Sequence, residues 1–410
     1  MVLNYIWVAF FVGAFLAALF QYFVQGDAGI FSQLVTALIE SSKTGFEIAI
    51  GLTGLMVFWL GLMQIGLQAG IINTIARWVS PFFVKLFPEV PPNHPAMGSM
   101  IMNFAANMLG LDNAATPLGL KAMHDLQSLN PEKEIASNAQ IMFLVINTAG
   151  LTLIPISIIM YRKELGAANP ADVFIPILLI TLFSATLSII ITGLVQKIQL
   201  LNATVILTFL GIFGFVGAMV WYFGRLSEAE LNTQSGFVSS FVLISIVTLF
   251  VSWGAYKKIN VYEAFIEGAK EGFQTAVGVI PYLIAVLVAV AVFRASGALT
   301  AITDGLAYLL TAIGINADFV PALPTAFMKP LSGSGARGLM LETMKTYGAD
   351  SFVGRTVCVV QGSTDTTFYI LAVYFGAVRI KNTRHALSCG LIADAIGVVG
   401  AILLAYLFFG

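Results

Sequence analysis

Charged side chains are scarce in this sequence. Asp, Glu, Lys and Arg together make up 10% of its 410 residues, whereas a soluble domain carries about 25%, so an ordinary soluble fold is excluded. The net charge of −1 offers no basic surface, which excludes nucleic acid as a partner. Hydrophobic residues instead make up 58% of the chain. Together with a mean hydropathy of +0.91, this composition predicts a protein that crosses a membrane several times.

Cysteine and histidine are also rare. The two cysteines, Cys358 and Cys389, lie far apart in the sequence, and we expect both to be buried thiols that behave as small apolar residues. The three histidines have no metal-ligand spacing, so we expect no metal site; they are His94, His124 and His385. A G-x-S-x-G turn, a paired-histidine motif and a P-loop are missing as well. The sequence therefore predicts neither an enzyme nor a resident cofactor.

Long apolar runs are what the chain has in abundance. Runs of about 20 apolar residues are long enough to span a bilayer as helices. The expected spans are residues 2–24, 46–71, 135–161, 174–196, 201–223, 236–256, 273–294, 353–378 and 384–409. Polar-spotted segments between them are typical of helices at the membrane surface. These are residues 30–44, 73–87, 257–272 and 299–313.

One apolar stretch, residues 321–338, does not fit a plain membrane helix. It holds three prolines, three glycines, two serines and two cations. Proline and glycine interrupt the helical hydrogen-bond ladder, and inside a bilayer the freed groups must be met by protein or by a polar cavity. A broken membrane helix is therefore a pointer to a binding site. Residues 95–117 form a second, looser stretch of this kind.

The order of elements repeats along the chain. Lys43-Thr-Gly-Phe46 matches Lys270-Glu-Gly-Phe273, and Ala69-Gly70 matches Ser296-Gly297 at the same offset. Both halves read as span, surface helix, broken stretch, span and span. If each broken stretch is a re-entrant hairpin, the halves enter the membrane from opposite sides. The sequence therefore predicts an all-α membrane fold of two inverted repeats with broken helices.

The second broken stretch supplies candidate ligands for an anion. Lys329 and Arg337 are costly at membrane depth unless they face a cavity or a partner. Ser332 and Ser334, with free backbone N–H groups beside them, would complete a concave anion site. The alternative is that both cations pair internally, with an aspartate such as Asp112, Asp365 or Asp394.

A polar run inside an apolar span adds further candidates. Gln361, Ser363, Thr364 and Asp365 cannot all lie on one helical face, so Gly362 is expected to mark a second unwinding. Asp365 could bind a proton or Na⁺, accept a hydrogen bond from a solute, or neutralise Arg337. The serine and threonine hydroxyls could instead bond back to their own helix.

Amide and carboxylate oxygens in the first broken stretch suit a hard cation such as Na⁺. We expect Asn107 to contact a solute, and Asp112 and Asn113 to bind a coupling cation. Polar contacts between helices are the alternative explanation. Asp394, alone in the last span, could be a protonatable coupling site or the partner of a buried cation.

Three of these motifs resemble known families. Residues 107–123, NMLGLDNAATPLGLKAM, resemble the signature of spore maturation protein A. Residues 330–338, PLSGSGARG, and residues 361–378, QGSTDTTFYILAVYFGAV, resemble spore maturation protein B. These families are usually separate chains, whereas here they look fused. Each half is similar to the nucleoside-recognition, or gate, domain, which also occurs in concentrative nucleoside transporters and ferrous-iron permeases.

The resemblance implies a division into an A-like gate half (1–200), linking spans with an amphipathic helix (201–272) and a B-like gate half (273–410). It also implies helical hairpins that meet at a central site. We therefore expect a multi-pass transporter or permease-like protein of the bacterial inner membrane. It would bind a small polar, anionic or nucleoside-like solute, with coupling to Na⁺ or H⁺, and could form homo-oligomers in the lipid. The alternative is a non-transporting membrane factor for envelope assembly or spore maturation.

Overall fold

The computed structural model describes residues 2–110 and 112–410, with backbone only for residues 2, 3, 112–114, 228, 229 and 232. The described chain is helical apart from loops and an isolated bridge between Ile135 and Asn382. Seven helices in it are long and apolar enough to cross a membrane. The prediction of an all-α, multi-pass membrane protein is therefore confirmed.

The first group of helices runs from the N-terminus to the middle of the chain. They are α1 (Val2–Phe20), α2 (Ile30–Gln68), α3 (Ile71–Leu86), α4 (Pro95–Met108), α5 (Asp112–Leu129), α6 (Asn138–Ala149), α7 (Ile156–Glu164), α8 (Phe174–Val195) and α9 (Ala203–Phe223). The second group completes the fold. They are α10 (Glu228–Tyr256), α11 (Val261–Ala295), α12 (Ala298–Ala312), α13 (Leu323–Met328), α14 (Gly333–Tyr347), α15 (Phe352–Gly362), α16 (Thr367–Ala377) and α17 (Ala386–Phe409).

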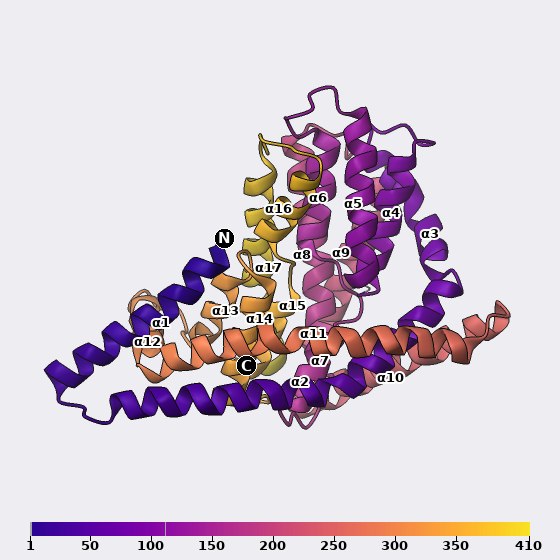
Figure 1. The fold of residues 1–410 in the computed structure, drawn as a ribbon. Coiled ribbons are helices and arrows are strands. Elements are labelled where there is room, and N and C mark those ends of the chain that lie inside the picture. Colours follow the sequence, from indigo (N-terminus) through magenta and orange to yellow (C-terminus); the bar gives the residue numbers. More distant parts are fainter. Residues whose placement is uncertain (1, 111) are drawn as a thin grey trace.

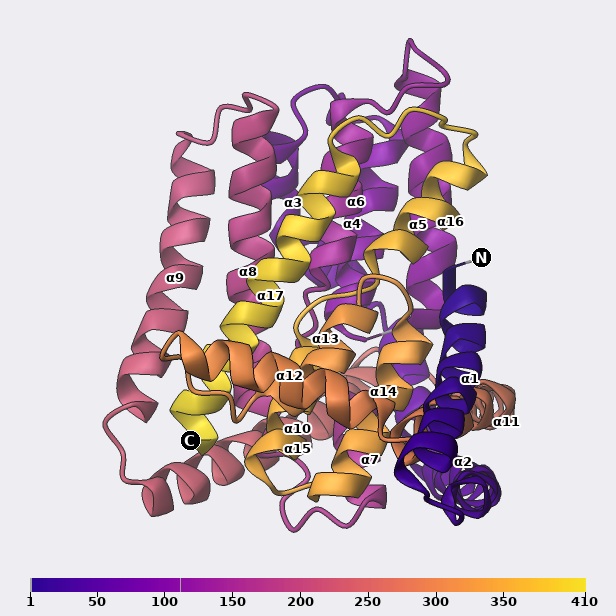
Figure 2. The ribbon, with the colours of Figure 1, turned by 90° about the vertical axis from the view of Figure 1, so that its left-hand side faces the viewer.

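Two long helices, α2 and α11, lie side by side across one end of an upright bundle that includes α4, α5, α6 and α8 (Figures 1 and 2). They run antiparallel, because Gly45 meets Leu287 whereas Gly61 meets Phe265. A Cβ atom added at Gly268 would come within 2.3 Å of the Leu60 carbonyl oxygen. Small residues thus let the two backbones approach closely, which is how helices pack inside membranes.

The structure corrects one prediction about these two helices. Residues 30–44 were expected to form a surface helix separate from a span at 46–71, and residues 257–272 one separate from 273–294. Instead α2 is a single helix of 39 residues and α11 one of 35 residues. The polar residues continue the helix along an exposed face, as the pairing of Lys43 with Glu47 at 3.6 Å shows. Gly45 does not end α2 because it serves the contact with α11.

Two helical hairpins and two broken helices form the centre of the bundle. The first hairpin is α4–α5 and the second is α13–α14, in which residues 329–332 form the tip. The first broken helix is α6–α7, interrupted at residues 150–155, and the second is α15–α16, interrupted at residues 363–366. Both predicted broken stretches and the unwinding after Gly362 are therefore present in the structure.

Backbone hydrogen bonds tie each hairpin to a broken helix. The Leu153 N–H of the first broken helix donates to the Met108 carbonyl of the first hairpin at 2.9 Å. The Phe368 N–H of the second broken helix donates to the Pro330 carbonyl of the second hairpin, also at 2.9 Å. The matching order of elements agrees with a repeat, while the inverted symmetry of the two halves stays a prediction.

Charged side chains join the loops at one end of the two broken helices. Arg162, which is fully buried, forms ion pairs with Asp172 at 2.8 Å and Asp350 at 3.0 Å. Arg355 binds the other oxygen of Asp172 at 2.8 Å. Burial raises the pKa of the Asp172 carboxyl above its ordinary value, although both arginines favour its charged form. At the opposite end an exposed pair, Lys381 with Glu134 at 2.6 Å, joins the corresponding loops.

The two ends give a matched test of what these contacts contribute. We expect Arg162→Ala to lower the melting temperature of the detergent-purified protein strongly, because the buried Asp172 then keeps Arg355 as the only cation of the two. Removing one partner of a buried ion pair costs up to about 3–5 kcal/mol. Lys381→Ala removes an exposed pair that is worth about 1 kcal/mol or less. Equal shifts in melting temperature for the two variants would contradict a structural role for the buried pair.

Candidate functional site

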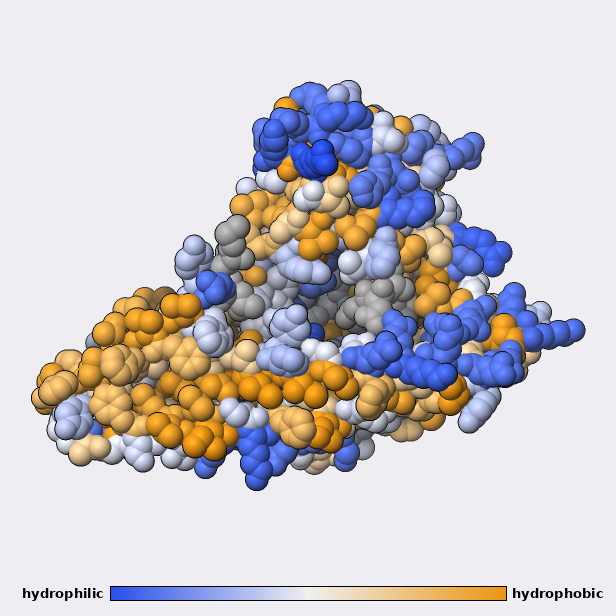
Figure 3. Space-filling view, in the orientation of Figure 1, coloured by the Kyte–Doolittle hydropathy of each residue, from blue (hydrophilic) through white to orange (hydrophobic). Residues whose placement is uncertain are grey.

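A cavity of about 450 Å³ lies where the hairpin tips, the broken helices and the long helix pair meet. Its polar wall comes from the first hairpin, the tip of the second hairpin and the interrupted segments. Side chains of α2 and α11 form part of the remaining wall. The space-filling view shows a hollow on this flank of the molecule, between the upright helices and α11 (Figure 3).

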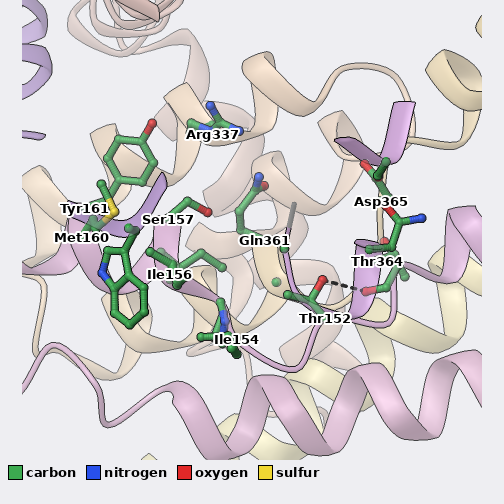
Figure 4. A pocket seen from close by; sticks show the side chains of 18 of the residues that line it. Thr152, Ile154, Ile156, Ser157, Met160, Tyr161, Arg337, Gln361, Thr364 and Asp365 are labelled. Atoms are coloured by element: carbon green, nitrogen blue, oxygen red, sulfur yellow. Dashed lines mark hydrogen bonds between the residues drawn. The ribbon is translucent and has the colours of Figure 1, made fainter. Parts of the chain in front are cut away.

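The structure brings six of the predicted binding residues to the wall of this cavity. They are Asn107, Lys329, Arg337, Gln361, Thr364 and Asp365. Figure 4 shows Arg337, Gln361 and Asp365 around the same space. Residues more than 200 positions apart in the sequence thus share one site. That they bind a solute stays a prediction.

Three predicted binding residues are not among the described lining residues. The Ser332 hydroxyl accepts a hydrogen bond from the Gly335 N–H at 3.0 Å and so caps the start of α14. Ser334 lies 3.3 Å from the Ser332 hydroxyl. Ser363 is fully buried and donates to the Val360 carbonyl at 2.8 Å. Ser332 and Ser363 therefore shape the backbone beside the cavity.

The predicted cation-binding residues lie in two places. The side chains of Asp112 and Asn113 are outside the described residues. Asp394 is buried in α17, behind the second broken helix, where one of its oxygens accepts a hydrogen bond from the Thr367 hydroxyl at 2.5 Å. Among the described residues, no three His, Cys, Asp or Glu side chains gather closely enough to hold a metal ion.

The crossing of the two broken helices fixes the position of Asp365. Its N–H donates to the Thr148 carbonyl of the first broken helix at 2.8 Å. Its carboxylate accepts a hydrogen bond from the next residue, Thr366 N–H, at 2.7 Å. Gly150 makes the crossing possible, since its φ is +60° and an added Cβ would lie 2.8 Å from the Asp365 nitrogen. The carboxylate is thereby held at the cavity by backbone geometry.

Asparagine amides join the first hairpin to the first broken helix. The Asn107 amide donates to the Asn147 side-chain oxygen at 2.8 Å, and Asn147 in turn donates to the Phe143 carbonyl at 2.9 Å. Asn103 is buried and donates to the Ala115 carbonyl at 2.8 Å, which ties α4 to α5. These bonds agree with the alternative that the asparagines connect helices, while Asn107 and Asn147 also line the cavity.

Two cations of the second hairpin, Lys329 and Arg337, are at the cavity. Lys329 is buried, with 6% of its surface exposed, and the Arg337 guanidinium lies 5.7 Å from the centre of the Tyr161 ring. With Asp365 on the second broken helix, the described wall carries two positive charges and one negative charge. Such a wall can hold a carboxylate or phosphate group beside a hydrogen-bond donor of the same solute.

Several lining residues were not predicted from the sequence. Trp59 and Met56 come from α2, Tyr161 from α7 and Tyr369 from α16. Each sits in an apolar span, where a large apolar side chain is unremarkable, so no local signal marks it. The contact between α2 and the broken helices brings them to the cavity.

The known families match the elements that build this cavity. The family described as "Gate: Nucleoside recognition" matches residues 49–168 and 276–381, more than half of the chain. The chain belongs to the nucleoside-recognition gate family. The matched ranges include both hairpins and both broken helices of this gate protein, and they leave out α9 and α10.

Two relatives from Bacillus subtilis (strain 168) match different parts of the gate protein. Spore maturation protein B is 50% identical over 165 residues, 40% of this chain and 91% of that protein. Spore maturation protein A is 40% identical over 188 residues, 46% of this chain and 92% of that protein. The predicted resemblance to fused A and B proteins is therefore confirmed. No solved structure matches the chain.

Substitutions at two glycines with left-handed backbone angles test the close contact between the two broken helices. We expect Gly150→Ala to lower the melting temperature more than Gly166→Ala. Both alanines carry the strain of a positive φ, about 1–2 kcal/mol. Only the first would also push against the backbone of Asp365 and Thr364, since Gly166 has open space around it. The melting temperatures are measured in detergent. Equal decreases for the two variants would show that the close backbone contact at Gly150 does not contribute to stability.

Proposed function

We propose that this gate protein is a transporter of the bacterial inner membrane that binds a small polar solute with an anionic group. One observation carries the proposal: Arg337 and Asp365 face a common cavity between two hairpin tips and two broken helices. Charges at membrane depth are retained where they serve a solute or an ion. Broken helices that end at a shared cavity are the usual architecture of secondary transporters.

Lys329 and Arg337 would bind a carboxylate or phosphate of the solute, because both cations line the cavity, Lys329 from the tip of the second hairpin and Arg337 from the beginning of α14. Asp365 and Gln361 would accept and donate hydrogen bonds on the opposite part of the solute. A nucleoside-like solute is one candidate, since the family is described by nucleoside recognition. Asp365 would also limit the net positive charge of the occupied site.

A coupling ion, Na⁺ or H⁺, belongs to the same proposal. Asp394 supports it because this buried carboxylate is bonded to Thr367, the first residue of α16 after the interruption. A change in the charge of Asp394 would therefore be transmitted directly to the end of the interrupted segment that carries Asp365.

The second candidate function is a membrane factor that assists envelope assembly without transport. It is favoured by the names of the two relatives, which describe spore maturation rather than a solute. In that case the polar residues at the interruptions would only form hydrogen bonds with backbone groups that the broken helices leave unpaired. A thermal-shift screen with nucleosides, peptides and carboxylates, each with and without Na⁺, separates the two functions. Stabilisation by a solute supports transport, whereas a crosslinked partner without any solute response supports assembly.

Charge-removing variants test the site itself. We expect Arg337→Ala and Asp365→Asn each to abolish solute-dependent stabilisation and flux in proteoliposomes, while the melting temperature without solute changes little. The matched controls are Arg77→Ala and Asp304→Asn, which alter exposed charges away from the cavity. Wild-type flux in both site variants would contradict the assignment.

A further inference from the structure

The wall contributed by α2 is apolar throughout. Leu52, Met56, Trp59, Leu60 and Met63 line the cavity, and all of the α2 residues described there are hydrophobic. They recur every three to four residues, which places them on one face of the helix. This face is turned toward the charged wall rather than toward lipid.

The apolar side and the charged side of the cavity are separated in space. In Figure 4, Ile154, Ile156 and Met160 extend the apolar side, Arg337 lies above them and Asp365 lies across from them. Lys329 and Arg337 come from the second hairpin alone, so positive charge is concentrated on that side of the described wall. A solute that contacts both the second hairpin and the α2 face therefore needs an anionic group and an apolar body.

The cavity opens on the flank of the molecule rather than at a polar end. Figure 3 shows the hollow between the hydrophilic top of the bundle and the largely hydrophobic surface of the long helices. Tyr369 lines the cavity and is 56% exposed, so the wall reaches the surface there. On α11, Thr275 and Val279 face the cavity, while Val277 is exposed on the outer face.

We propose that the solute is an amphiphilic anion: a carboxylate or phosphate group attached to an apolar chain or ring system. This inference rests on the proposed function and specifies its substrate class. The anionic group binds at Lys329 and Arg337, and the apolar body packs against the α2 face around Met56 and Trp59. A fully hydrophilic anion would leave that face in contact with water. Each buried methylene raises affinity about fourfold.

Trp59 provides a reporter inside the cavity. A variant that keeps it as the single tryptophan, with phenylalanine at positions 7, 78, 221 and 253, is placed in lipid nanodiscs. Bromine-labelled decanoate then serves as a soluble amphiphilic anion, bromine-labelled decanol as its uncharged counterpart, and bromine-labelled phosphatidic acid in the nanodisc as the lipid form. Acetate and inorganic phosphate are used as competitors without an apolar body.

We expect saturable quenching of Trp59 by the decanoate probe, with acetate and phosphate competing at least 100-fold more weakly. Arg337→Ala should weaken the decanoate affinity about 10-fold or more and leave quenching by decanol unchanged. Met56→Gln should weaken decanoate but not the small anions. The matched controls are Arg77→Ala and Ile50→Gln, the latter on the exposed face of α2, and both should behave as the parent.

Whether the anion is a membrane lipid or a soluble molecule is decided by which probe quenches Trp59 in a way that depends on Arg337. Arg337-dependent quenching by phosphatidic acid assigns a membrane lipid, and dependence for decanoate alone assigns a soluble amphiphile. Quenching that never saturates and survives Arg337→Ala is partition into the bilayer and overturns the inference. Equal affinity for acetate and decanoate overturns the amphiphile while the proposed binding site stands. No saturable binding of any probe, with no solute response in the thermal-shift screen, overturns the proposed function itself.

Discussion

The structure depends on one constraint: backbone groups freed in the middle of a membrane must find partners within the protein. The two broken helices meet this constraint together. The Asp365 N–H binds the Thr148 carbonyl, and each hairpin accepts a backbone hydrogen bond from a broken helix. Gly150, without a Cβ, lets the two backbones approach closely enough for that bond. The interrupted segments are therefore stabilised by one another and by the hairpins.

The chemical properties of the cavity follow from this crossing. An unbroken helix would bury the Asp365 side chain or turn it toward lipid, whereas the interrupted segment presents it to the cavity. The same holds for Lys329, which lies at the tip of a hairpin rather than within a helix. Charge at this depth is tolerated because protein surrounds the cavity. The polar wall is thus a consequence of how the backbone is satisfied.

The long helices and the loops support the centre from outside. In the α2–α11 pair, α2 lines the cavity with an apolar face, so the site combines charge with hydrophobic surface. At one end of the broken helices, Arg162 holds Asp172 and Asp350 in a buried network. Both features join segments from distant parts of the chain. The centre and its supports therefore form a single cooperative unit, in which the site depends on contacts far from it.

The sequence by itself determined the membrane class, the two breaks, the unwinding after Gly362 and the family, because composition, proline and glycine positions and motif residues act locally. Tertiary structure alone decided that α2 and α11 continue as single helices, that Trp59 and Tyr161 line the cavity, and that Ser332 and Ser363 form hydrogen bonds with the backbone. The physical reason is that the type of an apolar or hydroxyl residue, and the sequence around it, do not determine which distant segment will pack against it. Its role is set by the helix that packs against it.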